Sequence, residues 1–122
     1  MRRWLERVVR AHDGRIGRLC FVLMSDDGLL GYNIKYLDHH ELTDVITFQD
    51  DGAEGVSGDV LISYDRVREN ARHLGLCVQE ELRRVMVHGV LHLLGYTDKR
   101  PDARRRMREQ EDRWLEDYAS TL

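Results

Sequence analysis

Two histidines on an otherwise apolar helix constrain this chain more than any other feature of its sequence. His88 and His92 are four positions apart, so 3.6 residues per turn place both imidazoles on one helix face. Between positions 85 and 94 the other residues are Val, Met, Leu and Gly, and none of them is a zinc ligand. Such a helix packs against a core, where its imidazoles need polar partners. They are therefore either core histidines hydrogen-bonded to carbonyl or carboxylate groups, or ligands of a metal ion.

Gly95 and Asp98, which follow this helix, favour the metal ion. Glycine adopts positive φ without a steric penalty, so Gly95 can end the helix and turn the chain back. Asp98 can then reach an ion that His88 and His92 already hold. Two imidazoles, one carboxylate and an open fourth position are the usual arrangement of catalytic zinc. The sequence therefore predicts one Zn²⁺ ion bound by His88, His92 and Asp98, in a hydrolase that acts through a metal-bound water.

Zinc peptidases of the metzincin type share the spacing of this motif. In those enzymes a glutamate directly after the first histidine is the general base. Here that position is Gly89, so the motif contains no proton acceptor and a peptidase is disfavoured. No other residue is identified as the general base, because Asp44 and Asp59 are expected to cap strand ends.

The composition is that of one globular domain, residues 1–122, with 42% apolar and 34% charged residues. The net charge of −3 gives no general attraction to nucleic acid, so any such binding must come from a local basic patch. Cys20 and Cys77 form no C-x-x-C pair and are expected to be buried free thiols in a reducing compartment. No apolar run approaches the length of a membrane span, and charged residues interrupt any signal-peptide core. We therefore expect a cytoplasmic protein.

Hydrophobic periodicity predicts a small single-domain α+β fold, with a mixed sheet of about four strands packed against helices and the metal-site helix in the core. The expected strands are the apolar run 19–24, interpreted as buried, and the segments 45–48 and 60–63, which form an antiparallel hairpin. The expected helices are an N-terminal one that buries Trp4, Leu5, Val8 and Val9, one over 26–38 that buries Leu29, Leu30, Ile34 and Leu37, and three over 65–75, 79–94 and 101–118.

The last expected helix begins with a run of basic residues. Positions 99 to 108 contain six basic residues and one acid. This run is either a solvated face with ion pairs or a patch that binds phosphate. Because the run directly follows Asp98, its start lies close to the expected metal ion, where it would favour a polyanionic substrate.

Four segments resemble the YbeY family of bacterial rRNA-maturation endoribonucleases. Residues 88–96 (His-Gly-Val-Leu-His-Leu-Leu-Gly-Tyr) resemble the metal signature of the family, and residues 33–36, 43–48 and 58–63 match its other blocks in order. The resemblance implies a small α+β fold with one zinc ion and cleavage of single-stranded rRNA. It also implies a role in maturation of the small-subunit (16S) rRNA, on the small ribosomal subunit or its assembly particles.

The chain departs from the family pattern at two positions. Most members have a third histidine where this chain has Asp98, and since a carboxylate is also a zinc ligand, the metal role passes to Asp98. The family commonly has an arginine after the tyrosine of N-x-x-Y, where this chain has Leu37. A cation that would stabilise charge on the phosphate is thus missing there. The expected substitutes are Lys35, His39, His40 and the cluster 100–108; the residues expected to bind RNA are Lys35, His39, Lys99, Arg100, Arg104 and Arg105.

Three functions remain open at this point. The preferred one is a metal-dependent endoribonuclease of rRNA maturation. The second is a ribosome-assembly binding protein with a structural metal ion, which Leu37 and the missing general base favour. The third is a metal-dependent hydrolase of a small molecule or peptide, which Gly89 disfavours.

Overall fold

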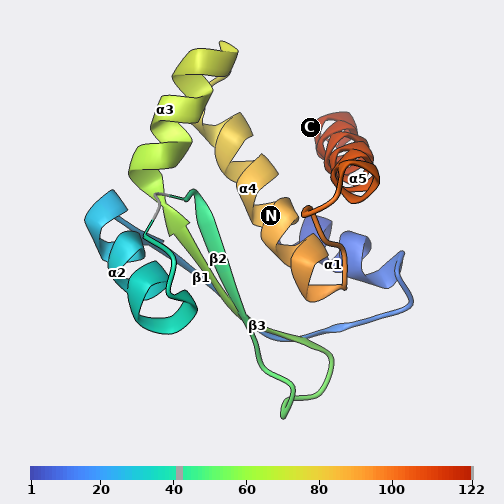
Figure 1. The fold of residues 1–122 in the computed structure, drawn as a ribbon. Helices are drawn as coiled ribbons and strands as arrows, with labels where there is room; N and C mark the ends of the chain where they lie inside the picture. The colour runs from blue at the N-terminus through green and yellow to red at the C-terminus, as the bar shows by residue number, and fades with distance from the viewer. Residues whose placement is uncertain (41–42, 122) are drawn as a thin grey trace.

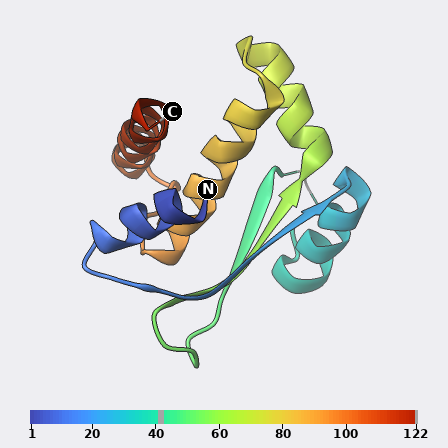
Figure 2. The same cartoon turned by 180° about the vertical axis from the view of Figure 1, so that it is seen from behind.

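A three-stranded sheet with helices on both faces forms the frame of the protein in the computed structural model, which describes residues 1–40 and 43–121 (Figures 1 and 2). The α+β class is confirmed. The described residues form three strands where about four were expected, and these three contain the segments 19–24, 45–48 and 60–63. The elements are α1 (Arg2–Arg10), β1 (Ile16–Met24), α2 (Asp26–Leu37), β2 (Val45–Gln49), β3 (Val56–Ser63), α3 (Tyr64–Leu74), α4 (Val78–Leu93) and α5 (Pro101–Ser120).

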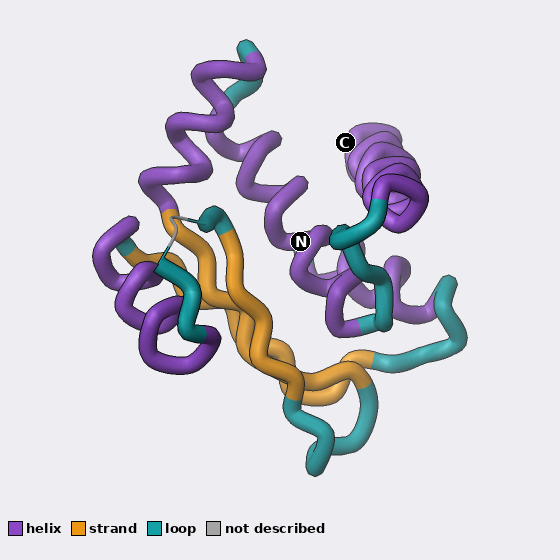
Figure 3. Tube along the Cα trace, viewed as in Figure 1, coloured by secondary structure: helices purple, strands orange, loops and turns teal. Residues whose placement is uncertain are grey.

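β3 is the central strand of the sheet. It pairs in parallel with β1 and antiparallel with β2, so the expected hairpin of β2 and β3 is confirmed. The loop that joins them extends beyond the end of the sheet (Figure 3). β3 begins at Val56, which places Asp59 inside the strand, opposite Phe48 and Cys20. Asp59 is therefore not a strand-end cap, because the strand starts earlier than its apolar run indicates.

β1 is an edge strand, which corrects the buried strand expected over residues 19–24. Val22 and Leu23 are 36% and 52% exposed, because β1 has a neighbouring strand on one side only. Cys20 on this strand is exposed, and so is Cys77 at the residue before α4. Both cysteines are free, but the expectation that they are buried is wrong. An apolar run in the sequence does not show whether other elements will cover the strand that it forms.

α2 buries fewer of its apolar residues than its sequence predicts. Leu29 is buried as expected, and Asn33 lies one turn later on the same inward side. Ile34 and Leu37 are instead 40% and 44% exposed, which corrects their expected inward positions. The core beneath α2 is a small cluster around Leu29, so the last turns of the helix have little apolar surface to cover.

α4 lies between the sheet on one side and α1 and α5 on the other, as expected for the metal-site helix (Figure 1). On one side its residues pack with Val60 and Ile62 of β3. On the other side they form a second cluster with α1 and α5, in which the Trp4 indole donates a 2.8 Å hydrogen bond to the Trp114 carbonyl. Both imidazoles thus stand on a helix held by apolar contacts from two sides.

Gly89 is a point of close approach between α4 and β3. A Cβ atom at Gly89 would lie 2.6 Å from Cγ1 of Val60, which is fully buried. A glutamate at this position would therefore face the sheet and not the two imidazoles. This contact gives the absence of a metzincin-type base a steric reason.

We expect Gly89→Ala to lower the free energy of unfolding by about 1–3 kcal/mol, because overpacking outweighs the better helix propensity of alanine. Urea denaturation measures this loss. Combined with Val60→Ala, the substitution should cost less than the sum of the two single changes, since Val60→Ala removes the clashing methyl group. Wild-type stability of Gly89→Ala alone would contradict the prediction.

Candidate metal centre

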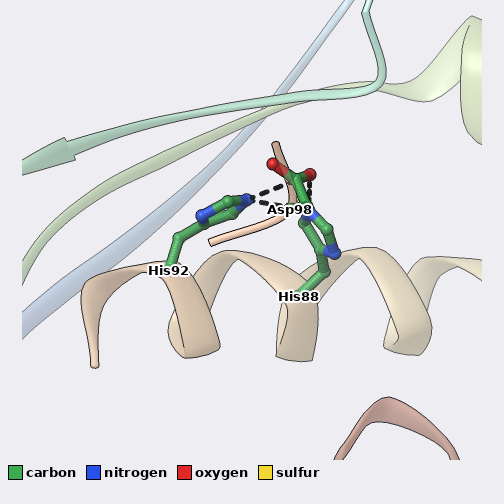
Figure 4. Close-up of side chains that lie close together, drawn as sticks. All are labelled: His88, His92 and Asp98. Atoms are coloured by element: carbon green, nitrogen blue, oxygen red, sulfur yellow. Dashed lines mark hydrogen bonds and ion pairs between the residues drawn. The ribbon is translucent and has the colours of Figure 1, made fainter. Parts of the chain in front are cut away.

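The structure brings His88, His92 and Asp98 together as the sequence predicts (Figure 4). Both imidazoles rise from the same side of α4, with ring centroids 4.6 Å apart. Gly95 has φ +106°, and its amide donates to the His92 carbonyl at 3.0 Å. This turn ends the helix and returns the chain over the imidazoles, so that Asp98 meets them from the segment before α5.

The three ligand atoms have the spacing that a tetrahedral ion needs. Nε2 of His88 and Nε2 of His92 are 3.0 Å apart. Oδ2 of Asp98 lies 3.4 Å from the first nitrogen and 3.6 Å from the second. A tetrahedral zinc site with ligand distances of about 2.0–2.1 Å has edges of about 3.3–3.4 Å. The donor types and their separations therefore both fit a zinc ion.

The hydrogen bonds of the two Nδ1 atoms explain why the two Nε2 atoms, which face each other, suit a cation. Nδ1 of His88 lies 2.6 Å from Oε2 of Glu111, and Nδ1 of His92 lies 3.1 Å from the Tyr96 carbonyl oxygen. Both partners accept hydrogen bonds, so each neutral ring carries its proton on Nδ1. The two Nε2 atoms then face each other with lone pairs and no proton between them. A metal ion satisfies both, and second partners of this kind are typical of metal-binding histidines.

Glu111 is a partner of His88 that the sequence motif did not predict. It lies on α5 and is only 8% exposed. The signal was present in the spacing of the inward face of α5, where an acid stands between Met107 and Trp114 in an apolar stripe. A carboxylate in such a stripe needs a partner, and His88 provides it.

Arg84 of α4 holds Glu111 in place. Its Nη1 lies 3.2 Å from Oε1 of Glu111 and 3.3 Å from Oδ1 of Asp112. Its Nε lies 3.6 Å from Oε1 of Glu81, a buried carboxylate whose pKa is raised by burial, against the lowering charge of Arg84. The Arg84 guanidinium thus offsets the negative charge of these acids. It also orients the Glu111 carboxylate that contacts His88.

The two histidines differ in basicity. Burial lowers the pKa of His88, but the hydrogen bond and charge of Glu111, with the charges of Asp44 and Asp98, together raise it above its ordinary value. For His92, burial and the charge of His88 lower the pKa, and Asp98 and the Tyr96 carbonyl do not offset them. His88 therefore holds a proton to higher pH than His92.

Asp44 acts on this centre through its charge. It precedes β2, and its carbonyl accepts a hydrogen bond from the Ser63 amide at 2.9 Å, which agrees with a position at the strand end. Burial raises the pKa of its side chain, against the opposing charge of His88. Asp44 is thus coupled to the centre as well as placed at the start of the strand.

We expect the affinity for zinc to fall as the pH is lowered through the pKa of His88. A proton must leave this imidazole before an ion can bind, and because its pKa is raised, the competition extends above the ordinary value of 6.5. One released proton corresponds to about a tenfold loss of apparent affinity per pH unit below that pKa. Competition with a chromogenic chelator at several pH values measures this slope. An affinity that stays constant down to about pH 5 would contradict the assignment of His88 as a ligand.

A groove of about 440 Å³ leads to the metal centre from the direction of α2 and β2. Two of the residues expected to bind RNA, His39 and Lys99, line it together with His92. Leu37, which stands where the family has arginine, lines it as well. Among the described residues, the lining consists of Asn33, Leu37, His39, Thr43, Val45, Ile46, Thr47, His92 and Lys99.

The other residues expected to bind RNA lie outside this groove. Arg104 directs Nη1 to the carbonyl oxygens of Asp98 at 3.5 Å and Lys99 at 3.4 Å, so it braces the loop that carries Asp98. Lys35, Arg100 and Arg105 are exposed on α2 and around the start of α5. Of the residues expected to bind RNA, His39 and Lys99 thus line the groove, whereas Lys35, Arg100 and Arg105 are exposed outside it.

The fold and this group of side chains define an α+β domain whose central helix presents H-x-x-x-H to an aspartate after a glycine turn, a set of donors that could hold a metal ion. The chain belongs to the YbeY family, because the family model described as "Endoribonuclease YbeY" matches residues 1–119. The family inferred from the sequence is thereby confirmed.

Several proteins named "Endoribonuclease YbeY" are similar to this chain. The one from Bacteroides thetaiotaomicron is 39% identical over 112 residues, which cover 92% of this chain and 82% of that protein. The one from Flavobacterium psychrophilum is 41% identical over 112 residues, covering 92% and 80%. The solution structure of TM1509 from Thermotoga maritima is similar with a TM-score of 0.68 and 26% identity, covering 98% of this chain and 82% of that one.

Within residues 1–40 and 43–121, every helix is too short or too polar to cross a membrane.

Proposed function

We propose that this protein is a zinc-dependent endoribonuclease in which residues 1–122 form one catalytic domain. The observation that carries the proposal is the convergence of two Nε2 atoms and one carboxylate oxygen, all within 3.6 Å of one another, beside an open groove. Relatives at about 40% identity carry the name endoribonuclease, which supports RNA as the substrate. Our proposal extends to single-stranded 16S rRNA, to the small ribosomal subunit or its assembly particles as partner, and to the cytoplasm as location.

The residues of the centre have two roles in the proposed catalysis: some would hold the ion, and others orient the imidazoles. A divalent ion held by His88, His92 and Asp98 supplies Lewis acidity toward a phosphate oxygen and makes water easier to deprotonate. Glu111 and the Tyr96 carbonyl keep the imidazole protons on Nδ1, which leaves both Nε2 lone pairs free for the ion.

Polar groups in the groove position the RNA backbone. Lys99 and His39 line the same groove as Leu37, so we assign them the phosphate contacts that the arginine of other members would make. Arg104 supports this arrangement indirectly, because its hydrogen bonds hold the loop from Asp98 to Lys99.

The alternative of a structural metal ion in a ribosome-assembly binding protein has less support. Leu37 in place of a cation is the observation that favours it. However, the side chains of His88, His92 and Asp98 are 21%, 25% and 42% exposed, so an ion there would be reachable from solvent. The cores on both sides of α4 consist of apolar contacts that need no metal ion.

Cleavage assays with and without a chelator test the proposed function. Zinc-loaded protein is incubated with a single-stranded RNA oligonucleotide, its duplex and a peptide library. We expect cleavage of the single strand alone, loss of cleavage after chelation, and an unchanged circular dichroism spectrum. Loss of the folded state on chelation would instead support a structural ion, and cleavage of peptides would overturn the assignment to RNA.

A further inference from the structure

α2 exposes an aromatic cluster that the metal centre does not use. Tyr32 and Tyr36 are 42% and 54% exposed, although both carry large apolar rings. Their centroids are 5.7 Å apart, with an interplanar angle of 23°. Tyr36 also meets the Phe48 ring of β2 edge-on at 5.7 Å, which fixes its position against the sheet. The two tyrosines thus form a partly exposed aromatic surface that Phe48 supports.

A hollow of about 320 Å³ adjoins these rings, and two glycines are among the described residues that line it. It is lined by Gly28, Gly31, Tyr32, Lys35 and Tyr36. A Cβ atom at Gly31 would meet no atom within 4 Å, so internal packing does not explain glycine in this helix. Glycine disfavours a helix, and it is used where a ligand must approach the backbone closely. The missing side chain leaves room for a flat group beside the tyrosines.

A cation completes the hollow. Nζ of Lys35 lies 5.2 Å from the centroid of the Tyr36 ring, within the range of a cation–π contact. Aromatic faces next to a positive charge suit a planar, electron-rich ring attached to a phosphate chain.

Residues of α2 line both the hollow and the groove of the metal centre. Leu37 lines the groove directly after Tyr36, and Asn33 lines it directly after Tyr32. On the strand side, Thr47 lines the groove and the neighbouring Phe48 contacts Tyr36. Consecutive residues of α2 and of β2 thus line the groove on the one hand and form or contact the tyrosine surface on the other.

We propose that the hollow formed by Gly28, Gly31, Tyr32, Lys35 and Tyr36 binds one unpaired nucleobase of the RNA strand whose backbone lies in the groove. This inference rests on the proposed function, because it takes RNA as the ligand. Stacking on aromatic side chains accepts any base but requires a base that is not stacked in a duplex. The hollow thereby gives a physical reason for selecting single strands.

Binding of abasic RNA tests the proposal. Zinc-loaded protein is mixed with a labelled single-stranded oligonucleotide or its abasic counterpart, and anisotropy is recorded before cleavage begins. We expect roughly 5- to 100-fold tighter binding of the strand that carries bases. Tyr36→Phe should keep this preference, whereas Tyr36→Leu and Gly31→Leu should remove it, because one deletes the ring and the other fills the hollow.

Tyr64 on α3 provides a matched control. It is 39% exposed and has the Arg68 guanidinium 5.9 Å from its ring centroid, but it does not line the groove. Tyr64→Leu should therefore retain the preference for bases. Gly31→Leu, which adds no clash at Cβ, answers the question if Tyr36→Leu fails to fold.

The outcomes separate the two proposals. If the wild type cleaves RNA but binds both strands equally, the nucleobase site is wrong and the nuclease stands. A preference that survives in Tyr36→Leu and Gly31→Leu also overturns the site and leaves this surface to a protein partner. If the wild type neither binds nor cleaves RNA, the proposed function fails, and the nucleobase site fails with it.

Discussion

His92→Ala is expected to remove zinc binding and to reduce RNA cleavage by at least about 1,000-fold while the fold is retained. The substitution leaves one imidazole and one carboxylate, which are too few ligands to hold the ion and keep a position open for chemistry. The fold should persist, because the apolar contacts of α4 lie on other faces of the helix. Metal content by elemental analysis, single-turnover cleavage and thermal unfolding together check this result.

His73→Ala is the matched control for this variant. His73 lies in the last turn of α3, is exposed, and pairs with Glu69 at 3.0 Å. Its removal should leave both zinc content and cleavage at wild-type levels. Wild-type cleavage by His92→Ala would refute the assignment of the centre, and unfolding of His92→Ala would support a structural ion instead.

Glu111→Ala is expected to weaken zinc affinity about 10- to 100-fold, the range found for partners of metal-binding histidines. It removes the 2.6 Å hydrogen bond that keeps the His88 proton on Nδ1. Glu111→Gln should cost less, because an amide oxygen can still accept that bond. Since Glu111 contributes most to raising the pKa of His88, both variants should also shift the pH dependence of zinc binding to lower pH.

Asp112→Asn separates the role of Glu111 from that of the ion pair with Arg84. Both acids contact Arg84, at 3.2 and 3.3 Å, but of the two, Glu111 is the one that contacts His88. Asp112→Asn should therefore leave zinc affinity and its pH dependence unchanged. Equal losses in the Asp112 and Glu111 variants would show that Arg84, and not the hydrogen bond to His88, determines the affinity.

The convergence of His88, His92 and Asp98 was predictable because these residues lie within one short segment. The spacing of His88 and His92 follows from helix geometry, and the turn at Gly95 follows from the freedom of glycine. The observed φ of +106° and the convergence of Asp98 agree with both inferences. Glu111 was not found, because its partner lies on another helix and no spacing along the chain relates the two.

Errors in the predicted fold arose where burial depends on a neighbouring element. The run over 19–24 is as apolar as a central strand. In the sheet, however, β1 lies at the edge, with β3 as its one neighbouring strand. Ile34 and Leu37 continue an apolar pattern, yet the core under α2 is too small to cover them. Periodicity predicts that an element forms, but the area available to bury it is a property of the packed molecule.

The amino-acid order alone specifies the helix with two imidazoles, the turn and the carboxylate, since these depend on backbone geometry over eleven residues. It also carries the family resemblance, which the match of the family model over residues 1–119 bears out. The packing of α5 on α4 brings Glu111 to His88, and the meeting of α2 with β2 forms the groove and the aromatic hollow. These features depend on contacts between segments that are distant in the sequence. A local sequence pattern does not determine the free energy of such contacts.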